Sequence, residues 1–423
     1  MCAFFVSNLK TSRYFLAPVM PTIKPFSALR PKPELAQQIC ELPYDVMSSE
    51  EARDLAKDNP YSFLHISKPE IDLEPGIDVY SEAVYKKGVE NFQLLLDQGA
   101  LVQDAKPCFY LYRQIMNGHV QVGLAVVASC QEYEEGIIKK HELTRPVKED
   151  DRVRHIEALN SQTGPVFLAC RTPAEYDAFT DRIISGNPDI EVMAPDGVQH
   201  ASWIVDRNED IAFIEQQFLG IDCLYVADGH HRTAAAARIN KSRKGVGQSG
   251  WFLAVIFPYE QIQILPYNRV VKDLNGRDVS QFLSELEGVF EIIDNHHGEC
   301  STKNELGLYL GGQWRGLLFK ADKRKSKAPV DELDVGLLQY HVLEPLLGVD
   351  DPRTSDRIGY IGGIHGVSEL ERLVDSGQYA CAFSLFPTRI EDLMEIADED
   401  GLMPPKSTWF EPKLRDGMFC HMI

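Results

Sequence analysis

A short polar run separates two apolar stretches in the middle of the chain. Residues 224–227 have the pattern of a buried strand, and the alanine run at residues 234–237 indicates a helix. The polar residues between them are therefore predicted at a helix N-terminus, where unpaired N–H groups and the helix dipole bind anions. Two imidazoles and a guanidinium there favour a phosphate group. The run is Asp228, Gly229, His230, His231, Arg232 and Thr233.

Two roles are open for this run. In the functional interpretation Asp228, His230 and His231 are catalytic, while Gly229, Arg232 and Thr233 hold the phosphate groups of a cofactor. In the structural interpretation the aspartate is an ordinary helix N-cap and the histidines are solvated.

A second group of charges surrounds a single carboxylate, Glu142. Phosphoryl transfer to a hydroxyl group requires a carboxylate that accepts the proton and cations that hold the phosphates. Glu142 is therefore a candidate base, and Lys140 and His141 are candidate phosphate ligands. The alternative is a solvated charged loop. The other members of the group are Lys139, Thr144, Arg145 and Lys148.

A third candidate segment lies near the C-terminus, at residues 403–410. Two prolines restrict its backbone, so a rigid loop could present Lys406 and Ser407 to an anion. Alternatively the segment is a strap whose Trp409 fills a gap in the core. Arg269 follows a predicted strand, and one interpretation of it is a surface ion pair.

The nine cysteines are scattered, and none forms a C-x-x-C pair. This argues against a disulfide framework or a zinc ribbon and favours a reducing compartment, the cytoplasm. No histidine or cysteine spacing suggests zinc, so no metal ligands are predicted from the protein itself.

The composition is that of a folded globular protein, with 44% hydrophobic and 25% charged residues in 423. The formal charge of −20 repels polyanions, so nucleic acid is not expected as a partner. No apolar window is long enough to span a membrane. The composition specifies neither protein partners nor an oligomeric state.

Local signals predict a mixed α/β chain. Ser48 and Glu51 form a capping box that begins a helix, and Asn117-Gly118 indicates a β-hairpin. Residues 62–66 have the pattern of a strand, residues 79–98 that of an amphipathic helix, and residues 151–159 that of a short helix. We expect a tail at 1–22, with Met1 or Met20 as the start, a core at 23–273 and a C-terminal region at 274–423.

The polar run resembles the D-G-H-H-R signature of free-serine kinases in the ParB/sulfiredoxin superfamily, where the matching loop handles nucleotide phosphates. Nearly the whole chain, from about residue 23 to 419, resembles a bacterial family known as domain of unknown function 1015. The resemblance implies an α/β (α+β) fold, with a ParB/sulfiredoxin-like core carrying insertions and a smaller α+β C-terminal region. The segments that carry it are residues 44–46, 140–146, 151–152, 228–232 and 403–413.

Departures from the superfamily exclude two of its activities. The loop has no cysteine, which sulfinic acid reduction requires, and it has neither the G-E-R-R type box nor the basic patch of DNA partition proteins. The remaining expectation is a nucleotide-dependent phosphotransferase that acts on a small hydroxylated metabolite, with serine or phosphoserine favoured and ATP or ADP with Mg²⁺ as cofactor. A phosphoserine-type phosphatase and a non-catalytic nucleotide sensor are the alternatives.

In this expectation Glu142 is the base, and Asp228 binds the substrate amino group or magnesium. The phosphates are held by His230, His231, Arg232 and Lys140. The resemblance to free-serine kinases, which have an arginine after a comparable strand, also implies that Arg269 reaches the same phosphate.

Overall fold

The Asn-Gly signal forms the central hairpin of the computed structural model, which describes residues 20–324 and 329–423. Strands β4 (Phe109–Met116) and β5 (His119–Ser129) pair antiparallel around it. Asn117 and Gly118 have φ values of 52° and 83°, as a two-residue hairpin turn requires. The predicted hairpin is confirmed.

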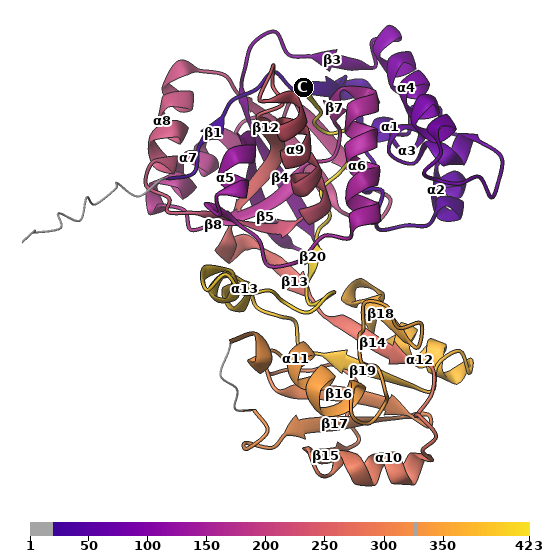
Figure 1. Ribbon diagram of the computed structural model, residues 1–423. Helices are drawn as coiled ribbons and strands as arrows, with labels where there is room; N and C mark the ends of the chain where they lie inside the picture. The colour runs from indigo at the N-terminus through magenta and orange to yellow at the C-terminus, as the bar shows by residue number, and fades with distance from the viewer. Residues whose placement is uncertain (1–19, 325–328) are drawn as a thin grey trace, which may run out of the picture.

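The hairpin lies inside a nine-stranded mixed sheet, which forms the N-terminal lobe (Figure 1). The strand order is β6-β11-β8-β12-β5-β4-β10-β9, with β1 paired to β5. Only the pairs β6–β11 and β8–β12 are parallel among the described strands. The remaining strands of this sheet are β1 (Ile23–Lys24), β6 (Ile138–Lys139), β8 (Val166–Cys170), β9 (Ile190–Met193), β10 (Gln199–Val205), β11 (Leu224–Asp228) and β12 (Trp251–Pro258).

A second, antiparallel sheet forms the C-terminal lobe, in the order β15-β17-β16-β19-β14-β18. It includes β14, so this sheet begins six residues before the expected boundary at residue 273. The mixed α/β fold with a smaller α+β region is confirmed. The strands are β14 (Tyr267–Val271), β15 (Phe290–Asp294), β16 (Glu305–Leu310), β17 (Gln313–Phe319), β18 (Ile358–Gly362) and β19 (Cys381–Leu385).

Helices cover both sheets. In the N-terminal lobe α7, α8 and α9 pack on the face of β5 to which Val126 and Ala128 contribute. No helix of the described residues is long and apolar enough to cross a bilayer. The helices are α1 (Ala36–Ile39), α2 (Ser49–Ala56), α3 (Leu64–Ser67), α4 (Glu82–Asp97), α5 (Cys130–Glu134), α6 (Pro146–Leu159), α7 (Ala174–Ile184), α8 (Asn208–Phe218), α9 (His230–Arg243), α10 (Val279–Leu286), α11 (Asp334–Leu338), α12 (Gly366–Asp375) and α13 (Ile390–Asp398).

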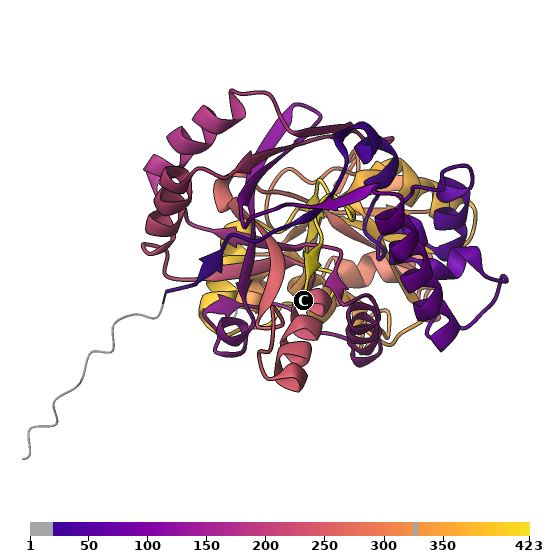
Figure 2. The same ribbon diagram turned by 90° about the horizontal axis from the view of Figure 1, so that it is seen from above.

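The last 21 residues, 403–423, leave the C-terminal lobe and return to the N-terminal lobe; we call them the return segment. Its strand β20 (Trp409–Glu411) pairs with β13 (Gln263–Leu265), and β21 (His421–Met422) pairs with β7 (Ser161–Gln162). Met418 and Phe419 are fully buried in the same core cluster as Ala125 and Val127, on the sheet face opposite to α7 and α8. In the view from above, the yellow return segment lies in the middle of the N-terminal lobe (Figure 2).

Other local predictions have mixed outcomes. The Ser48–Glu51 capping box is present at the start of α2, and the amphipathic helix forms as α4. The predicted strand at residues 62–66 is wrong, because these residues enter the short helix α3, which the Ser62 hydroxyl begins by accepting the Leu64 N–H. Helix α6 starts at Pro146 rather than residue 151. The tail was expected at residues 1–22, and its residues 1–19 lie outside the part of the chain that the structure describes.

Asp334, at the start of α11, gives the C-terminal lobe a pH-dependent stability. Burial raises its pKa from 3.8 to about 7, although it accepts the Asn304 N–H at 2.8 Å. The native carboxyl group is therefore protonated where the unfolded one is ionised. Its contribution to stability is present below pH 4 and is lost as the pH rises to about 7, by about 4 kcal/mol for a shift of this size.

Asp334→Asn is thus expected to leave stability unchanged near pH 4 and to increase it by a few kcal/mol at pH 8, since an amide keeps the acceptor and cannot ionise. Urea unfolding at both pH values measures this. Asp322→Asn, at a side chain that is 71% exposed, is the control and should change neither value. Equal stability of Asp334→Asn and wild type at pH 8 would show that the carboxyl is not held protonated.

Candidate active site

The site forms where two neighbouring parallel strands end. Strand β6 pairs with β11 through Ile138–Leu224 and Lys139–Tyr225. Because parallel strands end at the same edge of a sheet, the loop after β6 and the turn after β11 meet there. This pairing brings His141 and Glu142 to the residues that begin α9. The short pairing of β6 with β11 thus brings together the charged group around Glu142 and the polar run at residues 228–233.

The start of α9 follows the sequence prediction. Gly229 is the N-cap residue, with φ 94°, a conformation that a residue with a side chain rarely adopts. A Cβ atom at this position would lie 3.3 Å from the Cα of Val166. Asp228 Oδ1 accepts the Gly229 N–H at 2.8 Å, which leaves the N–H groups of the first helical turn available to an anion.

A cleft opens in front of this helix terminus, and its volume is about 1410 Å³ when the open solvent at its mouth is included. It is lined by six cationic side chains and three carboxylates, in a protein whose overall charge is −20. The cations are therefore concentrated at this site. They are Lys68, Arg145, Lys148, Arg232, Lys406 and Lys413, and the carboxylates are Asp45, Glu142 and Asp228.

Asp228 is paired with a residue of the return segment. Lys413 Nζ donates to Asp228 Oδ2 at 3.1 Å, and the two side chains are 11% and 32% exposed. Burial alone would raise the pKa of Asp228, but Lys413 and Arg232 hold it well below its ordinary value. Asp228 is therefore a permanent anion that faces the cleft.

Glu142 lies in a different environment from Asp228. Burial raises its pKa, and the nearby charge of Asp228 raises it further, while Lys406 opposes both effects. Lys406 Nζ also lies 5.5 Å from the centre of the Tyr267 ring. The two carboxylates therefore have pKa values shifted in opposite directions, an arrangement that separates a proton acceptor from a fixed charge.

Two histidines of the site, His230 and His231, line the cleft, and His141 packs against His230. The rings of His141 and His230 meet edge to face, with centroids 4.5 Å apart. Burial lowers the pKa of His141 to about 4 and that of His230 well below its ordinary value, so both rings are neutral. His231 Nε2 accepts the Arg145 N–H at 3.0 Å and so holds the loop after β6 against α9.

Arg232 lines the cleft, and its guanidinium group also contacts residues inside the N-terminal lobe. Its Nη1 donates to the Pro165 carbonyl, and Gly164 and Asp416 lie beside it. Burial opposes its charge, but the carboxylates of Asp45 and Asp228 keep its pKa raised.

Five predicted site residues do not line the cleft, and one of them is His141, which packs against His230. Lys140 is exposed and lies over the Tyr133 ring, and Thr233 is buried with its hydroxyl on the Gly229 carbonyl. Arg269 and Ser407 instead support the loop that carries Lys406. Ser407 Oγ donates to the Pro404 carbonyl at 2.6 Å, and Arg269 donates to the Tyr267 and Pro405 carbonyls.

Sequence reasoning did not select Lys413, Asp45, Lys68 or Tyr267 as site residues, although all four line the cleft. Lys413 and Asp45 belong to the segments that carry the family resemblance, which was the available signal for them. Lys68 directly follows α3, which the sequence analysis had predicted as a strand. Because that prediction was wrong, the position of Lys68 could not be predicted from it.

Comparison with known proteins places this chain in a family. The family model described as "Protein of unknown function (DUF1015)" matches residues 23–336. No curated protein matches the chain by sequence.

Several solved structures are similar to it at low identity. A free serine kinase in complex with AMP is 14% identical over 68% of this chain and 86% of its own, with a TM-score of 0.35. A conserved hypothetical protein from Pyrococcus furiosus is 15% identical over 69% and 93%, with a TM-score of 0.35. SbnI with C-terminal truncation, from Staphylococcus aureus, is 11% identical over 69% and 85%, with a TM-score of 0.36.

Proposed function

The chain belongs to the DUF1015 family of proteins of unknown function, and for this member we propose nucleotide-dependent phosphoryl transfer to the hydroxyl group of a small metabolite, with serine as the favoured acceptor and phosphoserine as its product. The observation that carries the proposal is the cleft at the start of α9. Six cations and a free helix N-terminus converge there in an otherwise acidic protein. Such a combination recognises a group with several negative charges, and phosphates are the commonest such ligands.

Glu142 and Asp228 suit the two tasks that binding and activating the acceptor molecule require. Glu142 accepts the proton of the attacking hydroxyl group, whose oxygen forms a bond to the terminal phosphorus while the bond from that phosphorus to the nucleotide oxygen breaks. Asp228, which stays ionised, binds a cationic group such as the amino group of serine. The phosphates lie against the first turn of α9, with Arg145 and Lys406 balancing their charge.

ATP or ADP is the proposed donor, and Mg²⁺ would accompany it on the phosphate oxygens. AMP, which the similar free serine kinase structure contains, is the corresponding non-donor ligand.

The first experiment is a thermal-shift series with ATP, ADP and AMP, with and without Mg²⁺ and serine. A ligand that binds only the native state stabilises it, by about 2.7 kcal/mol at a concentration of 100 times its Kd. Phosphorus NMR of the same mixtures then reports turnover. Phosphoserine formed from serine supports the proposal. Phosphate release from phosphoserine without nucleotide would replace it with a phosphatase, and nucleotide binding without turnover would replace it with a sensor.

Lys406→Asn is expected to weaken nucleotide binding by about tenfold or more. Lys406 has φ 60°, and asparagine tolerates this conformation, so the substitution removes the charge without straining the loop. Isothermal titration with ADP measures the effect. Lys241→Asn, on the exposed last turn of α9, is the control for the loss of one positive charge and should bind as wild type does. Equal affinity in both variants would exclude the cleft as the nucleotide site.

A further inference from the structure

We propose that His141, Glu142 and His230 form a binding site for a divalent transition-metal ion. This goes beyond the proposed function, because binding of nucleotide phosphates to the cleft requires none of these side chains as metal ligands. The sequence predicted no metal ligands, since the histidines come from segments that are far apart and lack any recognised spacing.

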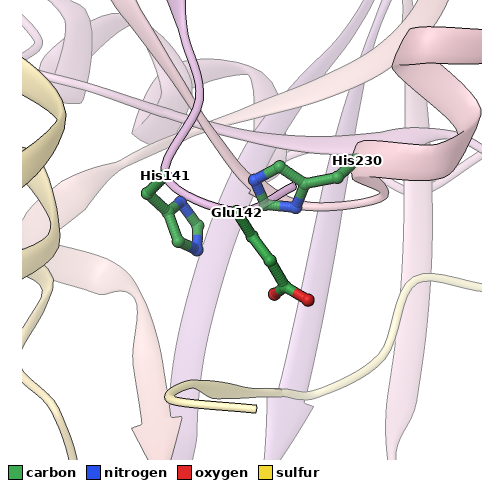
Figure 3. A group of neighbouring side chains, drawn as sticks. All are labelled: His141, Glu142 and His230. Atoms are coloured by element: carbon green, nitrogen blue, oxygen red, sulfur yellow. The ribbon is translucent and has the colours of Figure 1, made fainter. Parts of the chain in front are cut away.

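The first observation is geometric. His141 and Glu142 extend from the loop after β6, and His230 extends from the first turn of α9, so that the three side chains face one region (Figure 3). One ligand atom of each lies within 4.8 Å of those of the other two. Nitrogen and carboxylate ligands keep 2.0–2.2 Å from zinc, so the three atoms would move toward one another when an ion binds.

The second observation is independent of this distance and points to a missing partner. Nε2 of His230 is buried and has no hydrogen-bond partner among the described residues, and the His141 ring has a single backbone interaction, with Val226, which leaves its other nitrogen unpartnered. Only 2% of His141 and 7% of His230 is exposed. A buried imidazole nitrogen without a partner is unfavourable, so two such rings beside one carboxylate are unusual in a purely structural role. A metal ion satisfies them together.

The kind of metal follows from the ligands. Two imidazoles and one carboxylate suit zinc, iron(II), manganese(II) or cobalt(II), whereas Mg²⁺ prefers oxygen ligands alone. Glu142 and His230 also line the cleft, so the ion would keep a side that is open to a ligand there. A carboxylate that binds the ion through one oxygen keeps a second oxygen, so the site is compatible with Glu142 as a proton acceptor.

The test uses full-length protein without a histidine tag, treated with a chelator and then titrated with Zn²⁺, Mn²⁺, Co²⁺ or Mg²⁺ in the absence of nucleotide. We expect one equivalent of Zn²⁺ or Co²⁺ per chain, with Mg²⁺ at least 100-fold weaker. Bound Co²⁺ should show the visible absorption of a site with nitrogen ligands. Failure of wild-type protein to bind any of the three transition metals stoichiometrically would overturn the proposal.

His141→Gln, His230→Gln and Glu142→Gln should each weaken Co²⁺ binding at least tenfold. His231→Gln is the matched control, because this neighbouring imidazole already accepts the Arg145 N–H and should be dispensable for the metal. Circular dichroism melts confirm folding, and Glu142→Gln, at the least buried of the three positions, serves if a histidine variant does not fold. Unchanged Co²⁺ affinity in the folded variants would place the metal elsewhere and overturn the proposal. ADP binding by the chelated wild type distinguishes that outcome from failure of the nucleotide proposal.

Discussion

Asp228→Asn is expected to lower turnover by about 100- to 1000-fold, because the cleft loses the fixed anion that binds the substrate cation. It should also destabilise the protein. Lys413 is 11% exposed, and without Asp228 its ammonium group loses its ion-pair partner. Breaking a fully buried pair costs about 3–5 kcal/mol. Asp228 keeps 32% of its side chain exposed, so we expect about 1–3 kcal/mol here.

A double substitution separates the two effects. Lys413→Met alone should destabilise to a similar extent, because Asp228 then loses the cation to which it is hydrogen-bonded. Asp228→Asn combined with Lys413→Met should recover most of the stability, since both charges are gone, yet should remain inactive. Urea unfolding and the turnover assay on the four proteins complete the cycle. An active double variant would remove Asp228 from the mechanism, and additive losses of stability would show that the pair is not coupled.

Asp228 also shows where sequence reasoning succeeded. The run at residues 228–232 was assigned to a helix N-terminus, and the structure places it there, with Gly229 as the N-cap. The prediction worked because an apolar strand, a glycine and an alanine-rich helix are all local signals. The Asn117-Gly118 hairpin succeeded for the same reason.

The long-range part of the site could not be predicted in this way. Strand β6 has two residues, too few for any periodic pattern, yet its parallel pairing with β11 brings Glu142 to the helix terminus. The return segment is held by β20 and β21, whose partners lie much earlier in the chain. Its Lys413 therefore had no local feature that connected it with Asp228.

The strand predicted at residues 62–66 failed for a different reason. The apolar residues of this run are buried, as the strand prediction required: Phe63, Leu64 and Ile66 are all fully buried. A run this short has the same pattern in a buried helical turn, and the Ser62 hydroxyl, which accepts the Leu64 N–H, favours the turn. Burial was predicted correctly and conformation was not.

Glu142→Gln is expected to lower turnover by 100- to 10,000-fold, the usual contribution of a general base. Nucleotide affinity should stay equal or increase, because the substitution removes a negative charge beside Lys406 while the phosphates bind the first turn of α9. Steady-state turnover and ADP titration measure the two quantities. Glu149→Gln is the control: this nearby carboxylate pairs with Arg238 at 2.9 Å and does not line the cleft, so turnover should persist.

The same variant distinguishes the two roles assigned to Glu142. If its only role were to bind a metal ion, raising the concentration of Mn²⁺ or Zn²⁺ in the assay would restore activity in Glu142→Gln by mass action. A glutamine cannot accept the proton at any metal concentration, so we expect no such recovery. Recovery of Glu142→Gln with added metal would support the metal site and remove Glu142 as the base. Turnover of Glu142→Gln at the wild-type rate without added metal would show that turnover depends on neither role. Substitution of Glu142 therefore distinguishes the proposed general base from the proposed metal ligand.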